Sequence, residues 1–202
     1  MSANTPKRTD DVRQLVASTD LLQAEIERLK SDLTRAQNKI LELEARADFD
    51  PLLDILNRRG FERELTRALA FVERYGTTAA LMFIDLDSFK AVNDRYGHAA
   101  GDALLRAVAA ELSAHVRASD VVARLGGDEF GVLMWNLDSE RARIKATELE
   151  NLISCVRIGH GGAQLSAGAS AGVAVLSPDA TAAVMIDAAD KAMYARKKER
   201  RG

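Results

Sequence analysis

Residues 124–130 read Arg-Leu-Gly-Gly-Asp-Glu-Phe and stand between two short apolar segments, 121–124 and 130–135. Two such segments around a glycine-containing turn predict a β-hairpin. The paired glycines allow positive φ and a close backbone approach to a ligand, and two acids follow them directly. Gly-Gly-Asp alone is ordinary turn chemistry. The whole seven-residue run between apolar strands is far more specific, so we expect this turn to carry chemistry.

A second acidic pair ends another apolar segment. Residues 79–84 are predicted to form a buried strand, and Asp85, Leu86 and Asp87 follow it. Because alternate residues of a strand share a face, Asp85 and Asp87 are expected on one side. Acids at such a position need a partner, and a cation is the usual one. For Asp87 the alternative is an N-cap of the helix expected after Ser88.

The two acidic sites together predict a magnesium centre. Mg²⁺ takes one or two carboxylates and leaves positions for water and phosphate oxygens. Two such ions stabilise the attacking and leaving oxygens of an in-line displacement. The chain has no Gly-x-x-x-x-Gly-Lys-Ser/Thr loop. These features indicate nucleotide phosphoryl chemistry without a Walker loop, with Mn²⁺ as the alternative ion.

Helical and strand patterns alternate around these sites. The expected helices cover residues 58–75, 103–116, 141–155 and 182–198, and a strand region covers 165–176. Together with the strands above, this order predicts an α+β fold in which helices pack on one sheet.

Residues 12–47 carry an apolar repeat with alternating spacings of three and four. Its positions are Val12, Leu15, Thr19, Leu22, Ile26, Leu29, Leu33, Ala36, Ile40, Leu43 and Ala47. A 3.5-residue period keeps one seam facing a partner helix, so we expect a long coiled-coil helix that forms a homodimer. Packing of this helix on its own domain is the alternative, and Leu33 with Ala36 leaves a higher oligomer open. The predicted division is therefore 1–47 for dimerisation and 48–202 for the globular domain.

Composition fits one soluble domain with an appendage. The chain has 202 residues, of which 47% are hydrophobic and 29% charged, and its net charge is −2 at pH 7. This balance does not point to nucleic acid or to an anionic membrane. The single cysteine, Cys155, excludes an internal disulfide framework. The sequence shows no secretory signal and no apolar run long enough to span a bilayer, so a cytoplasmic location is expected.

Five motifs, in order along the chain, resemble those of the GGDEF-type diguanylate cyclase domain. They lie at residues 50–61, 85–94, 96–102, 124–130 and 189–194. The resemblance covers about three quarters of the chain. It implies a nucleotidyl-cyclase-like fold, with a mainly antiparallel central sheet flanked by helices. It also implies an enzyme that joins two GTP into cyclic di-GMP and releases two pyrophosphates.

The resemblance assigns the metal site to the carboxylates of Asp85 and Asp128, helped by the Leu86 carbonyl. Glu129 would hold metal or take the proton from the attacking 3′-hydroxyl. Because a carboxylate beside Mg²⁺ keeps a low pKa, the proton-accepting role is the less favoured of the two.

The resemblance also assigns the substrate contacts. Asn93 and Asp102 would read the guanine edge, since a carboxylate accepts from the N1 and N2 donors that adenine does not offer as a pair. Relatives with relaxed base choice carry serine at the position of Asp102, so aspartate favours GTP over ATP.

Phosphate binding would fall to backbone amides near a helix start and to two cations. The amides are those around Phe89 and Lys90. The cations are Lys197 and Arg201, for which a charged helix end favoured by the helix dipole is the alternative.

Arg117 and Asp120 form an Arg-x-x-Asp motif, with five residues between it and Gly126. By resemblance this placement marks an inhibitory site that binds the product, cyclic di-GMP. An arginine fork suits a guanine edge or a phosphate, whereas the alternative for Arg-x-x-Asp is a helix-end ion pair.

The sequence departs from the family pattern at two places, and one rival function stays open. Residues 53–56 read Leu-Asp-Ile-Leu where relatives commonly carry Thr-Gly-Leu-Pro, and the chain ends Arg-Arg-Gly where Gly-Arg-Asn is usual. The rival is a catalytically silent receptor or scaffold for GTP or cyclic di-GMP, although such relatives usually lose signature acids that this chain keeps. A separate protein partner on the coiled coil also stays open.

Overall fold

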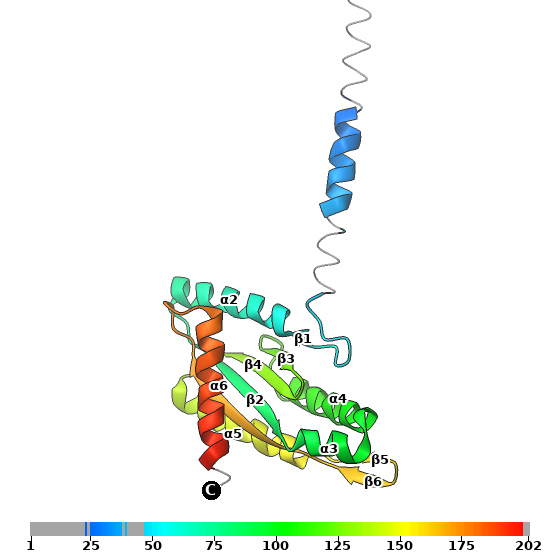
Figure 1. Ribbon diagram of the computed structural model, residues 1–202. Helices are drawn as coiled ribbons and strands as arrows, with labels where there is room; N and C mark the ends of the chain where they lie inside the picture. Colours follow the sequence, from blue (N-terminus) through cyan, green and yellow to red (C-terminus); the bar gives the residue numbers. More distant parts are fainter. Residues whose placement is uncertain (1–22, 24, 38, 40–46, 200–202) are drawn as a thin grey trace, which may run out of the picture. The chain divides into compact units, whose positions relative to one another are not determined.

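The computed structural model describes residues 23, 25–37, 39 and 47–199. It divides into two units, with the boundary between Ala47 and Asp48. In the first unit the described residues 23, 25–37 and 39 are helical (Figure 1). Ile26, Leu29 and Leu33 are 50%, 55% and 60% exposed in the single chain. An exposed apolar stripe at this spacing is what a coiled-coil seam presents before it pairs. The remaining repeat positions, apart from Ala36 and Ala47, lie outside the described residues.

The second unit is built on a five-stranded sheet with the order β1-β3-β4-β2-β7. Its strands are β1 (Leu56–Asn57), β2 (Ala79–Asp87), β3 (Val121–Gly126), β4 (Glu129–Trp135) and β7 (Gly168–Val175). The β1–β3 pair is parallel, and the β3–β4, β2–β4 and β2–β7 pairs are antiparallel. The predicted mainly antiparallel sheet is thereby confirmed. A separate hairpin joins β5 (Ile158–His160) to β6 (Ala163–Leu165).

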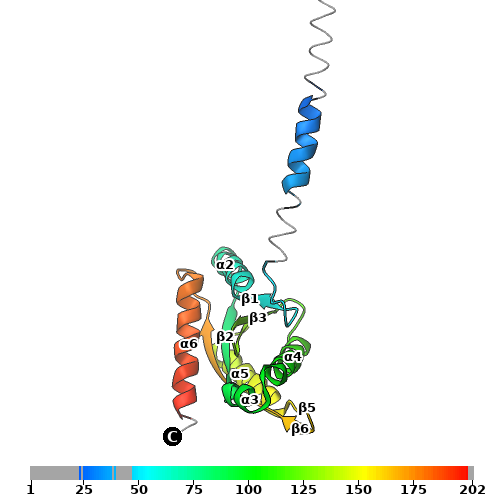
Figure 2. The same cartoon turned by 45° about the vertical axis from the view of Figure 1, so that its right-hand side comes forward.

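Helices cover both faces of this sheet (Figures 1 and 2). Helices α2 (Arg58–Tyr75) and α6 (Ala182–Glu199) contribute to one apolar cluster. The opposite cluster takes side chains from α3 (Phe89–Tyr96), α4 (His98–Ala114) and α5 (Ser139–Cys155). Strand β2 contributes apolar side chains to both clusters: Leu81 and Phe83 belong to the first, whereas Met82 and Ile84 belong to the second. This interior strand is therefore apolar on both faces until its last residues.

The helix predicted at 58–75 is confirmed in full, but several other bounds differ. Strand β2 runs to Asp87 rather than to residue 84, because its acidic end still pairs with β7. Helix α3 begins where a helix start was expected after Ser88, but its extent was not predicted: it is eight residues long and buries only Phe89. The strand region expected at 165–176 is divided between β6 and β7. No helix among the described residues has the length and apolar character needed to cross a membrane.

Candidate active site

Three carboxylates meet where the acidic end of β2 lies beside the β3–β4 turn. Asp85 is directly opposite Glu129 in the antiparallel register. The Leu86 N–H donates to the Asp128 carbonyl at 3.1 Å, which ties the turn to β2. Residues from segments more than 40 positions apart thus form one acidic centre. The four residues of the expected metal site lie together here.

Burial and mutual repulsion act on these acids. The pKa of Asp128 is raised by burial and by the neighbouring Asp85 carboxylate. The pKa of Glu129 is also raised, first by burial, with Asp85 and Asp190 adding to the effect and Arg58 opposing it. Acids that repel one another in a partly buried place are stabilised by a cation.

Lys197 of α6 brings one positive charge to this end of β2. Its ammonium group donates a hydrogen bond to Asp85 Oδ1 and lies 3.6 Å from Asp87 Oδ1. The side chains of Lys197 and Asp85 are only 17% and 18% exposed, so the pair is largely withdrawn from water. Lys197 therefore lies at the acidic centre, although it also belongs to the basic last turn of α6, where the helix dipole favours a positive charge.

Asp87 is not a helix cap. Ser170 Oγ of β7 donates to Asp87 Oδ1 at 3.1 Å, and the N-cap of α3 is Ser88. The capping alternative for Asp87 is therefore wrong, because its side chain points to β7 and α6. The two acids of β2 do share a face, since Lys197 reaches both Asp85 and Asp87.

The donor set fits a hard divalent cation. The carboxylates of Asp85 and Asp128 and the Leu86 carbonyl are oxygen ligands of the kind that Mg²⁺ and Mn²⁺ prefer. Within the described part of the chain, no three His, Cys, Asp or Glu side chains form a ready metal cage. Mg²⁺ does not require such a cage, since one or two carboxylates share the ion with water and substrate phosphates.

The two residues expected to read guanine come from α3 and α4, the helices that meet at Gly97. Asn93 lies against Gly101, since a Cβ on residue 101 would collide with the Asn93 side-chain oxygen. Asp102 is the next residue of α4 and is half-buried. Gly97, with a φ of 84°, makes the sharp turn between the helices. Glycine at 97 and 101 thus lets the two helices approach closely enough to place both polar side chains.

The α3 start offers backbone amides close to the acidic end of β2. Ser88 joins the two elements with a φ of 62°, which is rare outside glycine and typical of functional turns. The first N–H groups of a helix have no partner inside it, so those of Phe89 and Lys90 suit an anion. Arg201, the second expected phosphate cation, lies outside the described residues.

A pocket of about 240 Å³ contains the expected inhibitory residues Arg117 and Asp120. The Asp120 carboxylate accepts hydrogen bonds from the backbone N–H groups of Arg117, at 3.0 Å, and Trp135, at 3.2 Å. Arg141 and Lys145 of α5 also line this pocket. The sequence analysis missed both, although their spacing of four predicts that they share one helix face.

Arg58 is a further residue that the sequence analysis did not single out as part of a site. Its Nε donates to the Leu125 carbonyl at 2.8 Å, and its guanidinium lies 3.7 Å from Glu129 Oε2. Arg58 lies in the first of the five family motifs, at residues 50–61. The sequence around it does not show that its side chain reaches a turn some 70 residues away.

Comparison with known proteins agrees with this geometry. The family model described as "Diguanylate cyclase, GGDEF domain" matches residues 47–202. The chain belongs to the GGDEF diguanylate cyclase family.

Three relatives illustrate the similarity. The chain is 42% identical over 172 residues to the probable diguanylate cyclase DgcE of Escherichia coli K12, covering 85% of this chain and 16% of DgcE. It is 35% identical over 212 residues to the diguanylate cyclase TpbB of Pseudomonas aeruginosa UCBPP-PA14, covering 99% of this chain and 48% of TpbB. The chain thus spans half or less of the length of these curated relatives.

The third relative is a solved structure. It is the coiled coil and GGDEF domain of DgcB from Caulobacter crescentus in complex with c-di-GMP, with a TM-score of 0.72 and 28% identity. The match covers 88% of this chain and 95% of that one.

Proposed function

We propose that this chain is a diguanylate cyclase that condenses two GTP into cyclic di-GMP and two pyrophosphates as a homodimer. One observation carries the proposal: the acids Asp85, Asp128 and Glu129 converge beside the backbone amides of the α3 start. An acidic metal site next to an anion-binding helix start suits a nucleotide triphosphate.

Each group has a defined task in this reaction. The carboxylates of Asp85 and Asp128, with the Leu86 carbonyl, hold the divalent ion. When bound, Mg²⁺ supplies positive charge that stabilises the phosphate oxygens of the displacement. Lys197, held at the same strand end, adds a second positive charge for the phosphates. The amides of Phe89 and Lys90 bind the terminal phosphates.

Base recognition falls to the α3–α4 junction. Asn93 and Asp102 orient the guanine, because the Asp102 carboxylate accepts from two donors on its edge. Glu129 shares the ion or accepts the proton of the 3′-hydroxyl as that oxygen attacks. The new bond joins this oxygen to an α-phosphorus, and the bond to the β-phosphate oxygen breaks to release pyrophosphate.

The chemistry requires two copies. Each chain holds one GTP, and each 3′-hydroxyl must attack the α-phosphate held by the other chain, so a twofold arrangement matches the symmetric product. The predicted coiled coil of residues 1–47 would keep two domains at high local concentration. Support comes from the exposed apolar stripe of Ile26, Leu29 and Leu33. We place this GTP-consuming enzyme in the cytoplasm.

Product inhibition is proposed at the pocket of Arg117 and Asp120. Asp120 is held by two backbone amides, so its carboxylate is fixed beside Arg117. Arg141 and Lys145 add positive charge that suits the two phosphates of cyclic di-GMP. The relative DgcB was solved in complex with c-di-GMP, which shows that a chain of this fold binds the compound.

The test is incubation of the purified chain with GTP and Mg²⁺, with product identification by mass spectrometry. Cyclic di-GMP from the native chain and none from Glu129→Ala is the expected result. Arg106→Ala, an exposed change on α4, is the matched control and should stay active. Nucleotide binding without turnover in the native chain would instead support the receptor function.

A further inference from the structure

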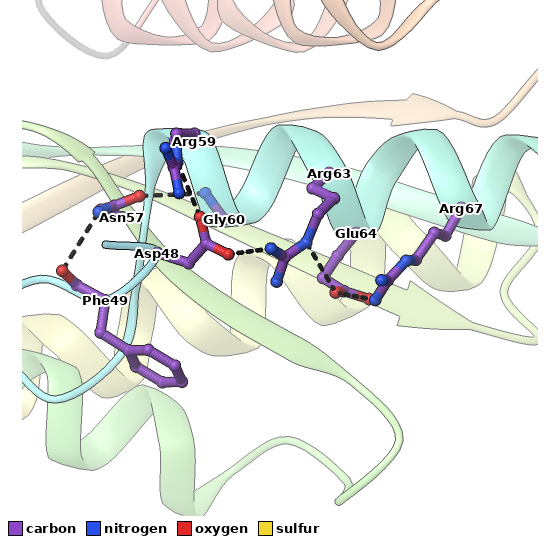
Figure 3. A network of polar contacts seen from close by, with 8 residues as sticks. All are labelled: Asp48, Phe49, Asn57, Arg59, Gly60, Arg63, Glu64 and Arg67. Carbon is purple, nitrogen blue, oxygen red and sulfur yellow. Dashed lines mark hydrogen bonds and ion pairs between the residues drawn. The ribbon is translucent and has the colours of Figure 1, made fainter. Parts of the chain in front are cut away.

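Asp48, the first residue of the second unit, carries a buried charge. Its side chain is 1% exposed, although the preceding Ala47 is exposed. The Asp48 Oδ1 accepts a hydrogen bond from Arg59 Nε at 2.9 Å, and Oδ2 forms an ion pair with Arg63 (Figure 3). Both arginines come from α2. A buried carboxylate is costly unless it is paired, so this contact is strongly preferred over an unpaired Asp48.

The main chain of Asp48 is held by the same helix start. Its carbonyl accepts the Asn57 N–H at 2.8 Å. The Asn57 side chain caps α2 by accepting the Gly60 N–H at 3.0 Å and donates to the Phe49 carbonyl at 3.2 Å (Figure 3). A Cβ on Gly60 would come within 2.5 Å of the Asp48 carbonyl oxygen, so the chain is seated closely against α2.

The same helix start also contacts the acidic centre. Arg58 lies between the two residues that hold Asp48, and it donates to the Leu125 carbonyl at 2.8 Å. Its guanidinium lies 3.7 Å from Glu129 Oε2. Three consecutive residues, 57–59, therefore join Asp48 on one side to the β3–β4 turn on the other.

We propose that Asp48 is a positioning residue for turnover: it holds the start of α2, and through Arg58 the Glu129 turn, in the arrangement that reacts. A displacement of the chain that enters at residue 48 would then change the position of Glu129. This inference rests on the proposed function, because the turn controls turnover only if the chain is a cyclase.

The test is made in the full chain with Asp48→Asn, which keeps the size of the side chain and removes its charge. We expect kcat to fall about tenfold while KM for GTP stays within about twofold, since a small misplacement of a reacting group lowers the rate more than the binding. Hydrogen exchange of backbone amides in residues 125–130 should become faster. This second readout does not depend on activity.

Two controls separate positioning from loss of stability. Ile153→Ala removes a fully buried side chain of α5 and lowers the melting temperature without touching the 57–59 contacts. Arg74→Ala removes an exposed arginine from the last turn of α2, outside the network of Figure 3. Neither should change exchange at residues 125–130. If Asp48→Asn does not fold, Arg59→Gln replaces it, because the Arg59 side chain is 60% exposed and its loss is easier to tolerate.

The outcomes are distinct. The inference is overturned if Asp48→Asn keeps kcat within twofold of the native value, or if exchange at residues 125–130 is unchanged in that variant. It is also overturned if Ile153→Ala, with a melting temperature lowered to that of Asp48→Asn, loses as much kcat as Asp48→Asn does. A native chain that makes no cyclic di-GMP overturns the proposed function instead. Faster exchange in Asp48→Asn would then still show that residue 48 and the turn are linked.

Discussion

Asp85 of β2 and Glu129 of β4 face each other as direct partners in the antiparallel register. Their carboxylates come from separate motifs, and the pKa of Glu129 is raised first by burial and further by the Asp85 carboxylate, against the opposing charge of Arg58. This pairing turns two acidic strand ends into one centre beside the α3 start.

The Mg²⁺ requirement of the reaction should depend on the Asp128 carboxylate. We expect Asp128→Asn to lower kcat by about two orders of magnitude and to raise the Mg²⁺ concentration needed for half-maximal activity, because a carboxylate ligand becomes a neutral amide. Chelation by EDTA should abolish activity of the native chain, and added Mg²⁺ should restore it. Activity titrations with Mg²⁺ measure both effects. Asp138→Asn, which changes the N-cap of α5, is the control and should keep the native metal requirement.

The preference for GTP over ATP should depend on the Asp102 carboxylate. We expect Asp102→Ser to lower the preference for GTP over ATP by about tenfold or more, because the acceptor for the two guanine donors is lost. The ratio of kcat/KM for the two nucleotides is the measurement. Asp94→Ser, an exposed change on α3, should leave the ratio as it is. An unchanged ratio in Asp102→Ser would place guanine recognition elsewhere.

Product inhibition should follow Arg117. Arg117→Ala removes the guanidinium from the pocket that also holds Asp120, so we expect the cyclic di-GMP concentration for half inhibition to rise at least tenfold. Initial rates with added product test this, and uninhibited kcat should stay near the native value. The exposed Arg157→Ala is the matched control and should be inhibited like the native chain. Inhibition of Arg117→Ala as strong as that of the native chain would exclude the pocket as the product site.

Dilution should distinguish the full chain from residues 48–202. Without the predicted coiled coil, two domains meet only by diffusion, so specific activity of the shortened protein should fall as its concentration falls. The full chain should hold its specific activity over the same range. Sedimentation alongside the assay reports the oligomeric state. Equal behaviour of the two proteins on dilution would remove the coiled coil from the mechanism.

Much of the site was predictable from local patterns. The hairpin at Gly126-Gly127 and the acidic end of β2 follow from short apolar runs interrupted by turn residues and acids. Helix α2 was predicted to the residue, because its apolar residues recur at helical spacing. Only the start of helix α3 was expected, since eight residues with one buried side chain give little periodicity from which to predict its extent. The extent of β2 was also underestimated, because polar residues at a strand end look like a loop when the neighbouring strand is not known.

Residue type and spacing along the chain were enough to predict the α+β class, the family motifs and the acids Asp85, Asp128 and Glu129. Three contacts could be seen only in the folded chain: Lys197 lies at Asp85, Arg58 reaches Glu129 and Arg59 holds the buried Asp48. Each of these contacts joins segments that sheet order and helix packing bring together. Ion pairing depends on side chains lying within a few ångströms of each other, so the pattern of one segment of the sequence cannot predict these contacts.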